Sequence, residues 1–130
     1  DDPDLLTALA SCAVLVRGNF VLQSRLMPLT PALQQARTFV LLLLQKRGHV
    51  ERVRLEQVFD ENEAVTSEAI QMLLEQVATR GTNGWQPKLQ DNLGLYELFP
   101  EQAQLHSQYW ERQETRFAHF LQMYKEATVS

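Results

Sequence analysis

Two apolar segments near the start of the chain are separated by a short turn sequence. The segments CAVLV, residues 12–16, and FVLQSRLM, residues 20–27, flank Arg17-Gly18-Asn19. Gly18 and Asn19 tolerate the positive φ angles that a tight hairpin turn requires. The pattern therefore predicts a β-hairpin, although polar and apolar positions alternate only partly in its second arm.

A helical periodicity follows the hairpin. Thr30 is a predicted N-cap, and Pro31 fits the first helical position, where its missing N–H is not needed. Apolar residues then recur at helical spacing up to Gly48, a predicted C-terminal stop; they are Leu33, Ala36, Phe39, Val40, Leu43 and Leu44. These signals predict one helix between Thr30 and Gly48.

The central part of the chain predicts a short strand and two further helices. Residues 49–55 are expected to form the strand, with Val50 and Val53 partly buried, and LEQVF reads as a short helix. Thr66 is a predicted cap for a third helix that ends at Gly81 and buries Ala69, Ile70, Leu73, Leu74 and Val77.

A second hairpin and a long helix complete the pattern. Asn83-Gly84 is a hairpin-turn sequence, and Trp85 begins the returning strand. Pro100 then opens one long predicted helix, in which residues spaced by seven form an apolar stripe, namely Ala103, Trp110, Phe117 and Tyr124, widened by Phe120 and Leu121.

The predicted elements follow the order of a winged-helix domain: helix, short strand, helix, helix and hairpin. We therefore predict a mainly α (α+β) fold with an N-terminal hairpin in residues 1–28, a winged-helix domain in 29–99, and a C-terminal helix in 100–130 packed on it. The hairpin is either the wing of an incomplete, preceding winged-helix unit or a ribbon added to the one domain.

Length and composition place the chain among compact globular domains. With 130 residues it fits one domain, and because it begins at Asp1 rather than Met we expect it to belong to a longer protein. Its longest apolar run, residues 39–44, is far shorter than the ~20 residues of a membrane span. The single cysteine, Cys12, has no internal disulfide partner, which favours a reducing compartment, cytosol or nucleus.

No catalytic, cofactor or metal site is predicted. Glycine-rich phosphate loops and the HExxH motif are absent, and the three histidines lie far apart in sequence. We expect His106 to be a packed or hydrogen-bonded residue, and Cys12 a small core residue. The acidic stretch at residues 60–66 lacks the glycine and glutamate of a calcium loop and reads as a solvated loop. We therefore expect no enzyme, no cofactor and no small-molecule substrate.

Charge argues against tight DNA binding. The net charge is −4, and the outward positions of the third helix are Glu68, Gln71, Glu75 and Gln76, where a DNA reader places donors or cations. The predicted wing adds only Lys88. Candidate interaction residues are the aromatic Trp85 and the cations Arg80, Lys88, Arg47, Arg52 and Arg54.

The segment LASCAVLVRGNFVLQS closely resembles the middle region of the fifth RNA polymerase III-specific subunit, also called the Sin-like family. The RxFV helix start of that family is matched by Arg37-Thr38-Phe39-Val40, and its GW wing by Gly84-Trp85. Its P-x-x-x-Q…W helix is matched loosely by Pro100, Gln104 and Trp110. The resemblance covers nearly the whole chain, while the loops and the third helix differ.

The resemblance implies a non-catalytic segment of DNA-directed RNA polymerase III. It implies a nuclear location, other polymerase III subunits as partners, weak or indirect DNA contact, no membrane contact, and a role in transcription of short noncoding RNAs. One alternative is a DNA-binding winged-helix transcription regulator. Another is a winged-helix adaptor of an unrelated cytoplasmic complex.

Overall fold

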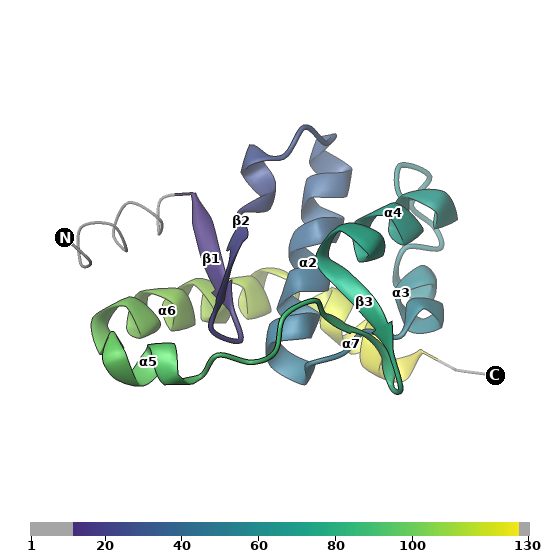
Figure 1. Ribbon diagram of the computed structural model, residues 1–130. Coiled ribbons are helices and arrows are strands. Elements are labelled where there is room, and N and C mark those ends of the chain that lie inside the picture. The colour runs from purple at the N-terminus through teal and green to yellow at the C-terminus, as the bar shows by residue number, and fades with distance from the viewer. Residues whose placement is uncertain (1–11, 128–130) are drawn as a thin grey trace.

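The computed structural model describes residues 12–127. The segment LLTALAS, residues 5–11, whose sequence predicts a short helical lead-in to the first hairpin, lies outside them. The fold is mainly helical, with two small antiparallel sheets (Figure 1). Its described elements are, in order, β1 (Ala13–Val16), β2 (Asn19–Leu22), the 3-10 helix η1 (Ser24–Leu26), α2 (Pro31–Arg47), α3 (Arg52–Val58), α4 (Ser67–Val77), β3 (Ala78–Gly81), β4 (Gly84–Pro87), α5 (Gly94–Leu98), α6 (Pro100–Arg116) and α7 (Ala118–Glu126).

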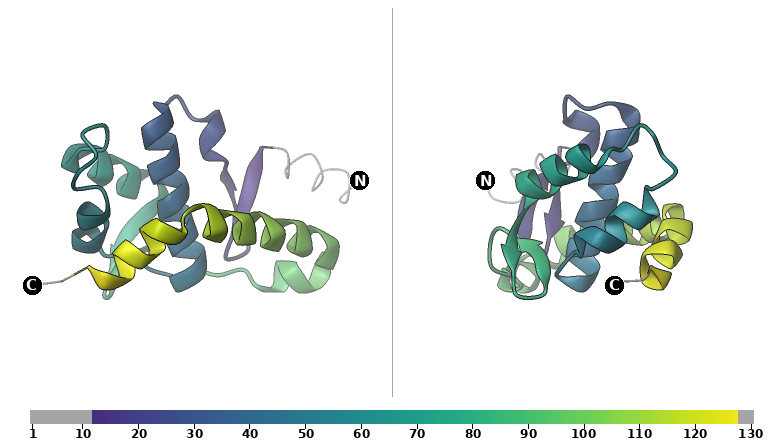
Figure 2. Two further views of the ribbon diagram at one scale, coloured as in Figure 1. Left: turned by 180° about the vertical axis from the view of Figure 1, so that it is seen from behind. Right: turned by 90° about the vertical axis from the view of Figure 1, so that its right-hand side faces the viewer.

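Helix α2 is the central element, with the other elements arranged around it (Figures 1 and 2). Its predicted ends are confirmed: the Thr30 side chain accepts a hydrogen bond from the Leu33 N–H, Pro31 is the first helical residue, and Gly48 has a φ of 80°. Every residue from Ala36 to Leu44 is buried. A helix that is apolar on every face needs other elements packed against each of those faces. The remaining helices and hairpins of this chain therefore pack around α2.

An aromatic cluster fills the space between α2, α3 and the C-terminal helices. The Phe39 ring is fully buried and lies 5.6–6.4 Å from the rings of Phe59, Phe117, Phe120 and Tyr124. Three of these four contacts are edge-to-face, an arrangement that aromatic quadrupoles favour. Phe39 therefore joins α2 to α7 and to the end of α3.

The first hairpin is confirmed, and its strand β1 is buried along its whole length. Strand β1 pairs with β2 on one edge only, so its other edge needs hydrogen-bond partners. Helix α6 supplies them at Leu15: the Leu15 N–H donates to Nδ1 of His106 at 3.2 Å, and the Trp110 indole N–H donates to the Leu15 carbonyl at 2.8 Å. Two side chains one helical turn apart thus satisfy the free edge of a buried strand.

The hairpin tip is held by the segment that leads into α5. Gly18 has a φ of 86°, and a Cβ built there would lie 1.9 Å from the carbonyl oxygen of Asn92, so glycine is required both for the turn and for this close approach. The Asn92 N–H donates to the Arg17 carbonyl at 2.8 Å, and the Gly18 N–H donates to the Tyr96 hydroxyl at 2.9 Å. The apolar hairpin is therefore an internal part of this core.

The strand expected at residues 49–55 is wrong. Only Val50 pairs, in a single antiparallel bridge with Trp85, and helix α3 already begins at Arg52. Val50 is fully buried, whereas Val53 points outward from the helix and is 46% exposed. One extended residue before a helix is enough to connect α2 to the second hairpin.

Three predicted boundaries also need correction. The second arm of the first hairpin ends at Leu22 and continues as η1. Helix α4 ends at Val77 rather than Gly81, because residues 78–81 pair with β4 as strand β3. The long C-terminal helix is broken at Phe117, whose buried ring packs on Phe39. The break lets α6 pack on β1 while α7 packs on α3.

Helix α5 was not predicted, because its sequence lies in a stretch without a clear periodicity. The order of α2, the Val50 bridge, α3, α4 and the β3–β4 hairpin agrees with the predicted order. The winged-helix assignment and the division at residues 28 and 99 remain predictions.

We predict that Trp110→Ala lowers the free energy of unfolding by about 3–5 kcal/mol, as expected for a large buried aromatic side chain. Trp110→Phe keeps most of the ring but leaves the Leu15 carbonyl without its donor, which costs about 1–3 kcal/mol. Denaturant unfolding followed by circular dichroism measures both. Leu105→Ala, at an exposed position of the same helix, is the control and should stay within about 0.5 kcal/mol of the parent chain. Unchanged stability in Trp110→Ala would contradict the structural role.

Candidate functional site

The second hairpin is built around Gly84 and Trp85. Gly84 has a φ of 116°, and a Cβ there would lie 2.7 Å from the Val50 carbonyl oxygen. Trp85 exchanges two backbone hydrogen bonds with Val50, at 2.7 and 2.8 Å. Trp85 as a whole is 7% exposed, and the Arg80 guanidinium lies 5.7 Å from the centroid of its ring. Trp85 is therefore a core residue whose one open side is covered by Arg80.

A groove of about 840 Å³ lies beside this hairpin. It is lined by residues of the α2–α3 connection and of the hairpin, including His49, Arg52, Val53, Arg80 and Asn83. The structure thus brings three of the predicted interaction residues, Trp85, Arg80 and Arg52, to one groove. Arg47, Arg54 and Lys88 do not line it.

Two of the predicted cations hold the fold together. The Arg54 guanidinium donates to the carbonyls of Tyr124, Lys125 and Ala127, the last turn of α7, and also pairs with Glu51. It therefore satisfies backbone acceptors that a helix C-terminus leaves open, and its charge is favourable there.

Arg52 connects α3 to the start of α4. Its guanidinium donates to the side chain and carbonyl of Ser67 and to the Gln71 side chain, and it lies 3.5 Å from the Glu56 carboxylate. Because the Arg52 guanidinium already makes these contacts within the chain, few of its N–H donors remain for a ligand.

The other three predicted cations are exposed. The Arg47 guanidinium lies 5.2 Å from the Tyr124 ring centroid, Arg80 covers Trp85, and Lys88 follows the end of β4. Within residues 12–127, none of the three forms a salt bridge. They are spread over different elements.

The outward face of α4 is acidic and amide-rich, as predicted. Glu68, Glu75 and Gln76 are exposed, while Ile70, Leu73 and Leu74 are buried. The Gln71 amide donates to the Glu75 carboxylate at 2.6 Å. Two carboxylates thus occupy the exposed face of α4.

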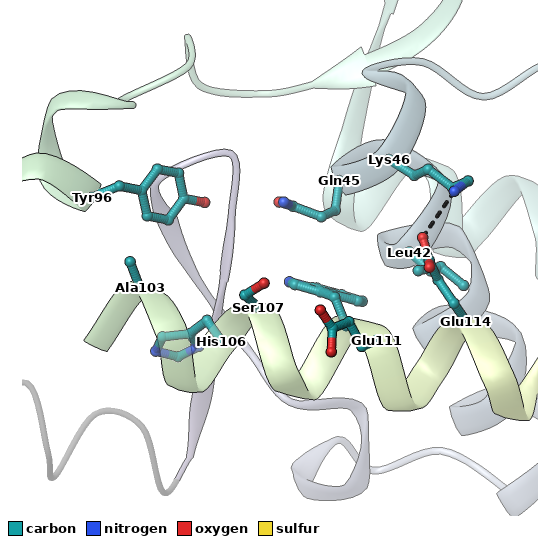
Figure 3. Close-up of a pocket in the computed structure, with 10 residues that line it drawn as sticks. Leu42, Gln45, Lys46, Tyr96, Ala103, His106, Ser107, Glu111 and Glu114 are labelled. Carbon is teal, nitrogen blue, oxygen red and sulfur yellow. Dashed lines mark hydrogen bonds and ion pairs between the residues drawn. The ribbon is translucent and has the colours of Figure 1, made fainter. Parts of the chain in front are cut away.

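A second groove, of about 390 Å³, lies between α2, α5 and α6 (Figure 3). Tyr96 faces Gln45 across it in Figure 3. Trp110 also lines the groove. A salt bridge of 2.9 Å between Lys46 and Glu114 lies at one end. Sequence reasoning missed this groove because one wall comes from α5, an element with no periodic signal.

His106 lines the same groove and is 5% exposed, so the prediction of a packed, hydrogen-bonded histidine is confirmed. Its Nδ1 accepts the Leu15 N–H and therefore carries no proton. Burial lowers the pKa of the His106 imidazole from its ordinary value, because desolvation penalises the charged form. The neutral imidazole is the form that this contact requires.

Four exposed leucines lie in the segment from the end of β4 to the first half of α6. We define the leucine row as Leu89, Leu93, Leu98 and Leu105, which are 51–74% exposed. They account for four of the eight exposed large apolar residues in the described part of the chain and occupy α5 and the segments on either side of it. Contiguous exposed apolar surface marks protein-binding regions, so the leucine row is a candidate for such a surface.

Groups of metal-ligand residues and membrane-spanning helices are not found in residues 12–127. No cluster of three or more His, Cys, Asp or Glu side chains there is placed to hold a metal ion. Likewise, none of the helices described has both the length and the apolar character that crossing a bilayer requires.

These features define a mainly helical protein with two hairpins and open surface grooves. The family model described as RPC5 protein matches residues 1–119, so the chain belongs to the RPC5 protein family. This is the family of the RNA polymerase III subunit that the hairpin sequence resembles. No curated protein matches the chain.

We predict that His106 makes folding stability depend on pH. Its pKa is lowered in the folded state, so its contribution is fully present above the unfolded-state pKa of about 6.5 and is lost as the pH falls below that value. Between pH 7.5 and 5.5 the loss amounts to at most about 1.4 kcal/mol. Urea unfolding of the parent chain and of His106→Gln at both pH values measures the difference. The same pH dependence in both proteins would contradict the assignment.

Proposed function

We propose that this chain is a non-catalytic, protein-docking part of RNA polymerase III that acts in the nucleus and supports transcription of short noncoding RNAs. We infer that residues 29–99 form a winged-helix domain, that residues 1–28 contribute its added hairpin, and that residues 100–130 pack on it. Family membership supports the polymerase assignment. The observation that favours protein over DNA as the direct partner is the acidic outward face of α4.

The charges on α4 oppose a DNA-reading role. A winged helix that reads DNA places its third helix in the major groove, where arginine, lysine and amide side chains address base edges and phosphates. Here Glu68 and Glu75 occupy exposed positions on that helix. Arg52 contacts the first turns of α4, but its guanidinium is already paired with Glu56 and hydrogen-bonded to Ser67 and Gln71. The carboxylates on α4 would repel the phosphates of DNA at the place where a DNA-binding protein needs cations.

The leucine row supports a protein partner. Burying exposed leucine side chains removes apolar surface from water, at roughly 25 cal/mol for each square ångström. The neighbouring groove between α2, α5 and α6 adds the aromatic surface of Tyr96 and Trp110. We propose that other polymerase III subunits contact this region.

We predict that Leu98→Ser with Leu105→Ser weakens association with the polymerase about tenfold, because truncating an interface anchor costs roughly 1 kcal/mol or more. Tagged protein carrying both changes is recovered from nuclear extract, and the co-purified polymerase III subunits are quantified. Leu22→Ser with Leu26→Ser, two exposed leucines of the first hairpin region, is the matched control. Equal recovery with both pairs would show that the leucine row is not the docking surface, and recovery of no polymerase subunit by the parent protein would refute the proposed function.

We also predict that the chain binds duplex DNA only weakly, with a dissociation constant above about 10⁻⁶ M at physiological salt, the nonspecific range. Fluorescence anisotropy against random and promoter-derived duplexes measures it. Glu68→Lys with Glu75→Lys should strengthen binding without unfolding the chain, since both positions are exposed. Glu97→Lys with Glu101→Lys makes the same charge change elsewhere and should strengthen binding less. Nanomolar, sequence-dependent binding by the parent chain would instead support a DNA-binding regulator.

A further inference from the structure

A third groove, of about 710 Å³, lies between the loop after α3 and helix α7. Helices α3 and α7 are in contact, and the two views of Figure 2 show them side by side. We define the acidic groove by its floor, which is Val58, Phe59, Phe120 and Met123, and by its rim, which is Asp60, Glu61 and Glu63. None of these residues was a predicted interaction residue.

The floor of the acidic groove is apolar and fixed in place. The Phe59 ring packs edge-to-face on Phe120 at 5.3 Å, and both rings contact the buried Phe39. Phe120 stacks on Phe117 as well. Phe120 and Met123 are only partly buried, so they present apolar surface to the groove. An incoming side chain would meet a surface that is already ordered by the core.

The rim carries three carboxylates on a hydrogen-bonded turn. Asp60, Glu61 and Glu63 are exposed, and no salt bridge within residues 12–127 involves any of them. The turn is closed at its centre by Asn62, whose N–H donates to the Phe59 carbonyl and whose side chain accepts from the Ala64 N–H, both at 3.0 Å. The negative charges are therefore held beside the apolar floor.

Apolar floor and acidic rim together point to a complementary ligand. We propose that the acidic groove binds a short segment of a protein partner in which lysine or arginine residues flank at least one large apolar side chain. The apolar side chain rests on Phe59, Phe120 and Met123, and the cations pair with the rim carboxylates. This inference deepens the proposed docking role and rests on it, by naming the chemistry of one partner segment.

Charge distinguishes this ligand from nucleic acid. Three carboxylates that lie within four residues repel a phosphate backbone, and none of the described residues that line the groove is a lysine or an arginine. The chain as a whole carries a net charge of −4, so its overall charge also disfavours association with a polyanion. A basic polypeptide therefore fits the groove, and a nucleic acid does not.

The probe is the blocked hexapeptide Lys-Arg-Leu-Phe-Lys-Arg, titrated into the 130-residue chain. Two control peptides separate the contributions: one replaces Leu-Phe by Ser-Gly at equal charge, and the other replaces the four cations by glutamine. Isotope-labelled chain is followed by NMR, and calorimetry gives the affinity. We expect shifts centred on Phe59, Asn62, Phe120 and Met123, binding that weakens with added salt, and weaker binding of both controls.

The decisive variant is Asp60→Asn, Glu61→Gln and Glu63→Gln together, which should weaken binding of the hexapeptide about tenfold, the scale expected when three exposed ion pairs are lost. The matched control removes three exposed carboxylates elsewhere, Glu97→Gln, Glu101→Gln and Glu111→Gln, and should keep the affinity within about twofold. Equal weakening by both triple variants would show a general charge effect and overturn the proposal. Shifts confined to other surfaces, or no binding by a folded chain, would also overturn it.

The outcome is separable from that of the proposed function. If the peptide fails to bind while the intact protein still recovers polymerase subunits, the docking role stands and the acidic groove is not its receptor. If the peptide binds but no polymerase subunit is recovered, the groove does bind basic segments, and the partners of the protein are not polymerase III subunits. The experiment thus tests the groove itself.

Discussion

The free edge of strand β1 is the constraint on which the rest of the fold depends. A strand with all four residues buried and only one neighbouring strand leaves backbone donors and acceptors that water does not reach. Each such group costs about 1–3 kcal/mol when it has no partner. His106 and Trp110 satisfy Leu15, and Gln45 with Asn92 satisfies Arg17 in the same way, at 2.6 and 2.8 Å. The packing of α6 and the path of the segment before α5 follow from this need.

The motifs that carry the family resemblance are structural. Arg37 of the RxFV motif is 4% exposed, and its guanidinium donates to the Leu22 carbonyl and the Ser24 hydroxyl, so it fixes the end of β2. Burial lowers the pKa of this guanidinium by desolvating its charge, and the nearby Tyr109 partly opposes the shift. Phe39 of the same motif centres the aromatic cluster, and the GW motif allows the close approach to Val50. The residues of the RxFV and GW motifs therefore stabilise the core, and they do not define a binding surface.

Elements with strong local signals were predictable from the sequence. Capping and stop residues predicted both ends of α2. Gly18 and Gly84, which both have positive φ, located the two hairpins, although each returning strand begins one residue earlier than predicted, at Asn19 and at Gly84. Three features depended on tertiary contacts instead. Val50 pairs only because Trp85 lies opposite, α4 stops early because residues 78–81 find a partner strand, and the helix breaks at Phe117 where the ring packs on Phe39. The exposed α4 face was predictable from its periodicity. The grooves were not, because their walls come from segments distant in sequence.

The hydrogen bonds of His106 and Trp110 to β1 have a consequence for synthesis on the ribosome. Leu15 lies 91 residues before His106 and 95 before Trp110, so its partners emerge long after the strand itself. At about 5–20 residues per second, the hairpin waits roughly 5–20 s for the helix that completes it. During that interval an apolar strand with an unpaired edge is open to association with other chains. We therefore expect the unpaired edge of β1 to be an association hazard of the nascent chain until α6 has left the ribosome.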